Sequence, residues 1–183
     1  ENLSIYAIRS DVEVAVNSGN VGMLTGANFG MVNNCRVFGE IHVTVTGYDA
    51  YVGGIAGGSA GTICQSVNYA DLIITASDET RLHTGGIAGY NGGEARDCYN
   101  TGTIDVSGPE DASGTNWLTG GIVGMNGEDS SLLTSYNTGS IIVDCVSGEE
   151  PGHLLPIGGI SGSNEGTISC CYYLEESDRK SVV

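Results

Sequence analysis

Aromatic and acidic residues gather in four segments of the chain: 44–51, 75–83, 107–118 and 144–156. Trp117, Tyr48 and Tyr51 carry flat rings on which a sugar or a peptide could stack. Asp111 and Glu149 are among the carboxylates that could bind a cation. We expect these segments to stack into one loop ridge, and the favoured interpretation of this ridge is a solvated acidic surface with Trp117 packed against the wall. Because insertions on one face of a repeat protein often mark its binding face, the alternative is a ridge that binds a host or cell-surface glycan or glycoprotein.

Metal binding and catalysis are weaker interpretations of the same segments. Calcium takes six to eight oxygen ligands, and no D-x-D-x-D-G pattern is present, so we expect no cofactor, with calcium as the lesser alternative. A polysaccharide-active enzyme needs two carboxylates at a defined separation on one wall, whereas these acids lie in loops. His83 and His153 lie in different segments, and no serine or cysteine occupies a nucleophile elbow. We therefore expect no catalytic residues and no enzyme.

The chain has six cysteines. Three of them alternate with two serines in one column of a repeated pattern: Cys35, Ser66, Cys98, Ser135 and Cys171. Cysteines of this column would lie two turns apart, about 9–10 Å, which exceeds disulfide reach, so we expect reduced, structural thiols. Cys145 with Cys170 is the one pairing that we consider. Without a C-x-x-C motif or a histidine pair, a metal site on sulfur is not expected.

A glycine-rich segment recurs five times, and it sets the frame for all of these residues. The third copy reads Gly85-Gly86-Ile87-Ala88-Gly89-Tyr90-Asn91. The apolar residue of each copy is Leu24, Ile55, Ile87, Ile122 or Ile160, at spacings of 31, 32, 35 and 38. An asparagine column follows, formed by Asn28, Asn91, Asn126 and Asn164, with Ser59 as the exception. Repeats of this length are single supersecondary units that stack on one another.

The residues between these segments alternate apolar and polar in short runs, which is typical of strands. Three short strands and three corners per repeat predict an all-β, three-sided parallel β-solenoid of about five turns. Residues 1–20 match the repeat poorly and are expected to form capping strands or a partial turn. The solenoid proper is predicted at 21–174, and 175–183 as a charged exit tail or linker.

The net charge of −16 restricts the partners. Nucleic acids and anionic membrane surfaces attract basic proteins, so neither is expected. No apolar run is long enough to insert in a membrane. Because the chain does not begin with methionine, we expect a processed or excised piece of a larger multidomain protein.

The segment from Gly85 to Gly93, followed by Cys98-Tyr99-Asn100-Thr101-Gly102-Thr103-Ile104, resembles the GLUG repeat. That repeat occurs in large secreted and surface proteins of bacteria, including adhesin-like proteins and IgA-cleaving proteases. The resemblance covers roughly residues 21–174, although Met23 replaces a glycine in the first copy and the second copy lacks the asparagine and the cysteine. It implies an extracellular or cell-surface location and a role as rigid spacer, display scaffold or adhesive module.

Overall fold

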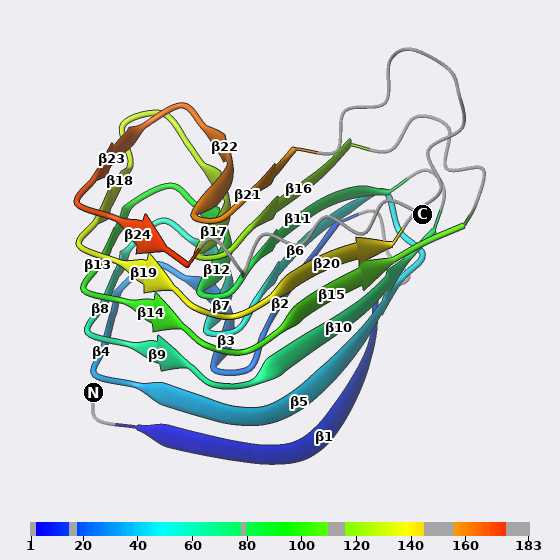
Figure 1. Cartoon of the computed structure of the whole chain (residues 1–183). Helices are drawn as coiled ribbons and strands as arrows, with labels where there is room; N and C mark the ends of the chain where they lie inside the picture. The colour runs from blue at the N-terminus through cyan, green and yellow to red at the C-terminus, as the bar shows by residue number, and fades with distance from the viewer. Residues whose placement is uncertain (1–2, 15–17, 78–79, 110–115, 145–155, 175–183) are drawn as a thin grey trace.

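The computed structural model describes residues 3–14, 18–77, 80–109, 116–144 and 156–174, with the backbone alone for residues 7–14. In this part of the chain every strand pairs in parallel with its counterpart from the neighbouring turn (Figure 1). It contains no helix, and hence none that could cross a membrane. The prediction of an all-β parallel β-solenoid is confirmed.

Three of the four sheets contain five strands each. Sheet B consists of β2 (Ser18–Gly22), β6 (Asp49–Gly53), β11 (Arg81–Gly85), β16 (Asn116–Gly120) and β21 (Ile157–Gly158). Sheet C consists of β3 (Thr25–Asn28), β7 (Ala56–Ser59), β12 (Ala88–Asn91), β17 (Val123–Asn126) and β22 (Ser161–Asn164). Sheet D consists of β4 (Met31–Asn33), β8 (Thr62–Cys64), β13 (Glu94–Arg96), β18 (Ser131–Leu133) and β23 (Thr167–Ser169).

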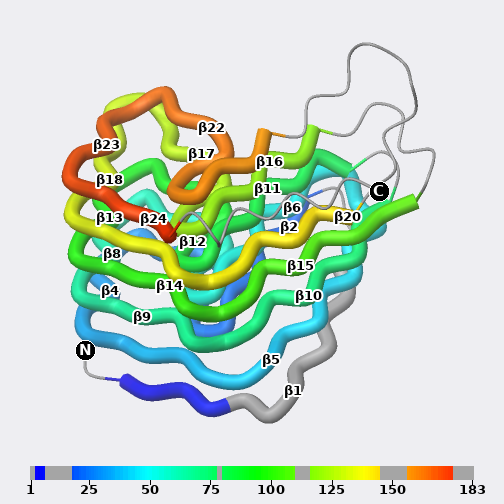
Figure 2. The backbone as a smooth tube through the Cα atoms, viewed as in Figure 1, coloured from blue at the N-terminus to red at the C-terminus, as the bar shows by residue number. Residues whose placement is uncertain are grey.

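Sheet A closes each turn and has a long and a short half. The strands of the long half are β1 (Ser4–Val14), β5 (Arg36–Val45), β10 (Asp71–Ala76), β15 (Ile104–Ser107) and β20 (Ile141–Asp144). Those of the short half are β9 (Val67–Asn68), β14 (Tyr99–Asn100), β19 (Tyr136–Asn137) and β24 (Tyr172–Tyr173). β5 is long enough to run through both halves (Figure 2), and β1 pairs with it along both.

We call one strand from each of sheets B, C and D, with the part of sheet A that follows, a rung. The five rungs complete about four turns, one fewer than expected. The outline has more than three sides, because the chain bends at each glycine pair, as at Gly53-Gly54 between β6 and β7. Sequence reasoning had placed the residues before this bend in loops.

The predicted loop ridge is therefore partly sheet. β6, β11 and β16 begin inside the segments 44–51, 75–83 and 107–118, and β5, β10 and β15 end near their starts. The connection from sheet A to sheet B that is described in full, at 46–48, is shorter than the predicted segment 44–51. In the sequence, the later segments contain more residues toward the C-terminus.

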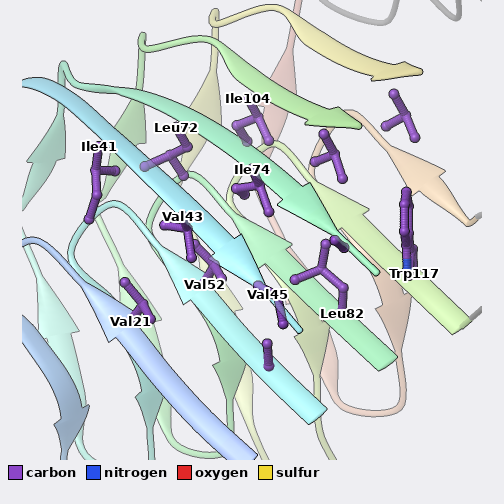
Figure 3. Close-up of a cluster of buried hydrophobic side chains, with 14 of the residues drawn as sticks. Val21, Ile41, Val43, Val45, Val52, Leu72, Ile74, Leu82, Ile104 and Trp117 are labelled. Atoms are coloured by element: carbon purple, nitrogen blue, oxygen red, sulfur yellow. The ribbon is translucent and has the colours of Figure 1, made fainter. Parts of the chain in front are cut away.

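The apolar side chains form two clusters. One lies between sheet B and the long half of sheet A and includes Val43, Leu72 and Leu82 (Figure 3). The other lies between sheets C, D and the short half of sheet A, and includes Ile55 and Ile87. The prediction of buried apolar columns describes both clusters, whereas the division into two was not expected.

The glycine pairs separate these two clusters. A Cβ atom at Gly54 would overlap the side chain of Asn68, and one at Gly86 would overlap that of Asn100. The missing side chain therefore lets a polar asparagine lie at the boundary between two dry cores.

The two predicted flanking segments have different outcomes. β1 and β2 both pair in parallel with the stack, through β5 and β6. Residues 175–183, predicted as a tail, lie outside the described residues.

Candidate functional site

Trp117, the main predicted ligand contact, lies inside the protein. It is the register partner of Leu82, and its side chain is 1% exposed within the core below sheet B (Figure 3). The indole Nε1 donates a hydrogen bond of 3.1 Å to the carbonyl of Thr80. This burial contradicts the alternative in which Trp117 stacks on a ligand and fits the favoured interpretation, in which it packs against the wall.

Tyr48 stays at the surface, with 51% of its area exposed, but a neighbour covers its ring. The Arg81 guanidinium lies 5.1 Å from the ring centroid and donates a 3.3 Å hydrogen bond to the Tyr48 hydroxyl. Arg81 also approaches Asp49, its register partner, at 3.8 Å. One face of Tyr48 is thus occupied by an arginine of the next rung.

Tyr51 packs edge-on against two aromatic side chains. The ring of His83, its register partner, lies at 5.0 Å and that of Tyr90 at 5.8 Å. Burial, followed by the charge of Asp49, raises the pKa of Tyr51, and burial lowers the pKa of His83. Nδ1 of His83 is buried without a hydrogen-bond partner. The described rings of the predicted ridge thus all make contacts within the protein, while Asp111 and Glu149 lie outside the described residues.

The largest aromatic assembly is one that sequence reasoning missed. Five rings follow one another along the outer face of the short half of sheet A: Tyr6, Phe38, Tyr69, Tyr99 and Tyr136. Three of the four contacts are parallel stacks with centroids 4.6–4.8 Å apart, the spacing of the rungs. A signal was present in the sequence, since each rung carries an aromatic residue beside the second turn.

The stack changes column between Tyr69 and Tyr99. Tyr69 follows Asn68 in the sequence whereas Tyr99 precedes Asn100, so the two rings meet at 88°. Their hydroxyls lie 2.6 Å apart, and this hydrogen bond, with burial, raises the pKa of Tyr99 to about 12. Because stacked rings cover one another's faces, the assembly exposes mainly ring edges and hydroxyls.

A surface hollow of about 200 Å³ lies at the C-terminal end of this aromatic stack. It is lined by Tyr136, Asn137, Thr138, Tyr172, Tyr173 and Leu174. Tyr172 is the register partner of Tyr136 and is 70% exposed. Three phenol rings with no charged group among them could hold a neutral, partly apolar ligand.

The predicted asparagine column forms a ladder of hydrogen bonds. Nδ2 of Asn91 donates to Oδ1 of Asn126 at 2.8 Å, and Nδ2 of Asn126 donates to Oδ1 of Asn164 at 2.8 Å. Asn28 donates instead to the hydroxyl of Ser59 at 3.0 Å, and this hydroxyl contacts the carbonyl of Gly61 in its own rung. The ladder is therefore a structural element, interrupted at the serine.

A second ladder occupies the boundary between the two cores. Nδ2 of Asn68 donates to Oδ1 of Asn100 at 2.7 Å, and Nδ2 of Asn100 donates to Oδ1 of Asn137 at 2.9 Å. All three side chains are fully buried. In the fifth rung Tyr173 pairs with Asn137 and ends the ladder. The Asn-Thr-Gly sequences at this corner predicted a turn and gave no indication of the side-chain ladder.

The cysteine column is also structural. The Ser66 and Ser135 hydroxyls accept hydrogen bonds of 3.1 Å from the backbone amides of Cys35 and Cys98. Burial raises the pKa of the Cys98 thiol to about 12, so this thiol stays protonated and unreactive at neutral pH. Cys170 is a free, exposed thiol, and its considered partner Cys145 lies outside the described residues.

The carboxylates of the walls pair with their neighbours. Arg96 contacts Glu94 at 2.7 Å and Asp97 at 3.0 Å, and the Thr134 hydroxyl hydrogen-bonds to Asp97 at 2.5 Å. That hydroxyl, with Arg96, holds the pKa of Asp97 below its ordinary value. Within the described ranges no three His, Cys, Asp or Glu side chains are placed to hold a metal ion.

Comparison with known families supports the sequence resemblance. The model of the GLUG motif matches residues 80–105. The chain contains a GLUG motif. The matched residues run from Thr80 to the second residue of β15 and so form one complete turn through all four sheets. The resemblance predicted for the third copy is confirmed, and strand pairing places the other copies in register with this GLUG turn. No curated protein and no solved structure matches the chain.

Proposed function

We propose that this chain is a rigid, non-catalytic repeat domain that spaces or displays other parts of a larger secreted or surface-anchored bacterial protein. The GLUG motif supports a repeat domain within a larger protein. The observation that carries the proposal is the use of polar and aromatic side chains along the axis. The buried second asparagine ladder and the aromatic stack on the outer face both connect successive rungs along the axis.

The stiffness of the solenoid follows from the burial of the second asparagine ladder. A satisfied hydrogen bond contributes about 1 kcal/mol, but a buried amide that loses its partner costs about 1–3 kcal/mol. Sliding or tilting one rung against the next breaks the contacts of Asn68, Asn100 and Asn137 together, without water to replace them. Nearest-neighbour coupling of this kind makes a solenoid behave as one body.

The extracellular location is part of the same proposal. The net charge of −16 suits a soluble protein in an extracellular setting. Phosphate-rich partners are disfavoured by the same charge, so we propose neither a nucleic acid nor an anionic membrane as partner. No cofactor is part of the proposed role.

Single-molecule pulling tests the spacer role. With the chain held between two marker domains, we expect little extension until one cooperative rupture. Asn100→Ala should lower the rupture force, whereas Ser140→Ala, at an exposed side chain in the same wall, should not. Smooth extension at low force, without a rupture event, would contradict a rigid spacer.

Glycan binding is a second candidate, moved from the predicted ridge to the hollow beside β24. Three exposed tyrosines favour it, because aromatic rings next to hydroxyls suit the mixed faces of a neutral sugar. A glycan array should then retain the protein, Tyr172→Ala should abolish retention, and Tyr48→Ala should leave it unchanged. Absence of retention, or equal loss in both variants, would exclude this site.

A further inference from the structure

Among the described residues, sheets B, C and D end in open edges. β2, β3 and β4 form one end, β21, β22 and β23 form the other, and each of these strands has a single neighbour in the described part of its sheet (Figure 2). Leu24 at the first end and Ile160 at the second are partly exposed, whereas Ile55, Ile87 and Ile122 of the same column are fully buried. A parallel edge with half-covered apolar columns is a template for another strand.

The first asparagine ladder has a direction, so its two ends differ chemically. In the middle rungs each Nδ2 donates toward the C-terminal end, as from Asn126 to Asn164. Nδ2 of Asn164 donates to Gly166 of its own rung at 3.1 Å, which leaves its second hydrogen facing the open edge. At the other end, Oδ1 of Asn28 accepts from the amide of Gly30, and a carboxamide oxygen can accept two hydrogen bonds. One edge of the stack is thus a donor and the other an acceptor.

We propose that a second copy of this chain stacks head to tail on the first, with its first rung on the fifth rung. This arrangement places Leu24 over Ile160 and Asn28 over Asn164. It repeats the contact that each middle rung makes with the next, because the first and fifth rungs contain the same columns. The chain's own rung is thus an occupant that matches this edge in backbone register, apolar column and hydrogen-bond direction.

Sheet A confines the contact to sheets B, C and D. β24 pairs with β19, and β1 pairs with β5 on its N-terminal side. When a copy is added, β24 and the first half of β1 fall at the same level, so Ser4–Ala7 must leave β5. Removal of residues 1–7 should therefore strengthen the association. The contact joins two different surfaces, so it produces open-ended chains and does not close at a dimer.

Sedimentation velocity over a wide range of protein concentration tests this association. We expect the mean mass to grow with concentration past that of a dimer. Asn164→Asp should keep the protein monomeric, because its carboxylate still accepts from Asn126 but repels Oδ1 of Asn28 in the added copy. Gln65→Glu makes the same amide-to-acid change at an exposed corner of the side wall and should assemble like the wild type. Thermal unfolding by circular dichroism checks that both variants fold.

A mixture of variants tests the polarity of the contact. Leu24→Lys blocks the other end, so each of Leu24→Lys and Asn164→Asp should be monomeric alone. Mixed together, they retain one good edge each and should form a dimer that grows no further. A wild-type chain that stays monomeric at every concentration, or stops at a dimer, would overturn the proposal. So would equal assembly of Asn164→Asp and Gln65→Glu.

Discussion

The third and fifth rungs are built from the same repeat, yet they differ in burial. Ile87 and Asn91 of the third rung have no exposed surface, whereas Ile160 is half-buried and Asn164 is exposed. The third rung has a neighbour on both sides, and the fifth has one among the described residues. The repeat therefore determines the strand register, and the neighbouring rungs determine whether a given side chain of the repeat is buried.

The largest expected difference between the two rungs is the loss of stability when a charged side chain replaces their isoleucine. Ile87→Asp should cost about 4 kcal/mol or more and unfold the stack, because its carboxylate has no partner in a dry column. Ile160→Asp should cost less than half of that, since its carboxylate can reach water at the edge. Denaturant unfolding followed by circular dichroism measures both. Equal losses would show that the end rung is covered as fully as the middle one.

Ladder truncation should give a smaller difference. Asn100→Ala removes one of two acceptors of Asn68 Nδ2 and one of two donors to Asn137 Oδ1, both fully buried, and should cost about 2–3 kcal/mol. Asn164→Ala removes one of two acceptors of Asn126, but at the exposed end of the other ladder water can take its place, so the change should cost about 0.5 kcal/mol. Urea midpoints with Ser140→Ala as reference give these values. A loss at Asn164 as large as that at Asn100 would contradict the role assigned to burial.

Substitution of either of two buried threonines should increase stability, in contrast to the two preceding pairs of variants. Thr84 and Thr119 are buried on β11 and β16, and their Oγ1 atoms have no hydrogen-bond partner. Thr84→Val removes the unpaired hydroxyl and keeps the branched shape, so we expect a gain of about 1 kcal/mol. Thr167→Val, at an exposed site of the fifth rung, should change little. A loss of stability in Thr84→Val would mean that its hydroxyl is bonded in solution.

The smallest expected effect is a pH dependence from the third rung. Burial lowers the pKa of His83, so the folded protein keeps this ring neutral where the unfolded chain, with a histidine pKa of about 6.5, already binds a proton. The unfolded state then binds more protons, and stability should fall as the pH drops below that value. His83→Gln should flatten this part of the stability profile. An unchanged slope in the variant would assign the effect to other groups.

The β-solenoid architecture could be predicted from the sequence, whereas the number of sides of its cross-section could not. The spacing of Ile55, Ile87 and Ile122, together with three short strands per repeat, indicated stacked parallel turns, because stacking places such a column in register. The spacing did not reveal the bend at Gly53-Gly54. A glycine pair indicates that another part of the chain lies close to the backbone, but the sequence does not show which residue that is. The partner is Asn68, and this contact turns one core into two.

The candidate site was predicted less well. Trp117 lies after a loop-like segment rich in Gly, Ser and Pro, so its composition left both a packed and an exposed indole open. The polar Asn116 before Trp117 and the apolar Leu118 after it do not give a clear strand pattern, because the residues before β16 show no regular alternation of apolar and polar side chains. The aromatic stack was readable in principle, since Phe38, Tyr69 and Tyr99 recur at the second turn. Each of these side chains is exposed or half-exposed, so a search for buried apolar columns did not include them.

Amide hydrogen exchange of the Asn164→Asp variant, which keeps the end rung free, tests the central claim most directly. The amide of Ile87 donates to Ile122 inside the stack at 2.9 Å, whereas that of Tyr172 donates to Ser135 from the last rung at 3.0 Å. We predict that Ile87 exchanges only through global unfolding and that Tyr172 exchanges through local opening, at least about tenfold faster. Equal protection of the two amides would contradict the claim that neighbours, and not the repeat itself, make the core.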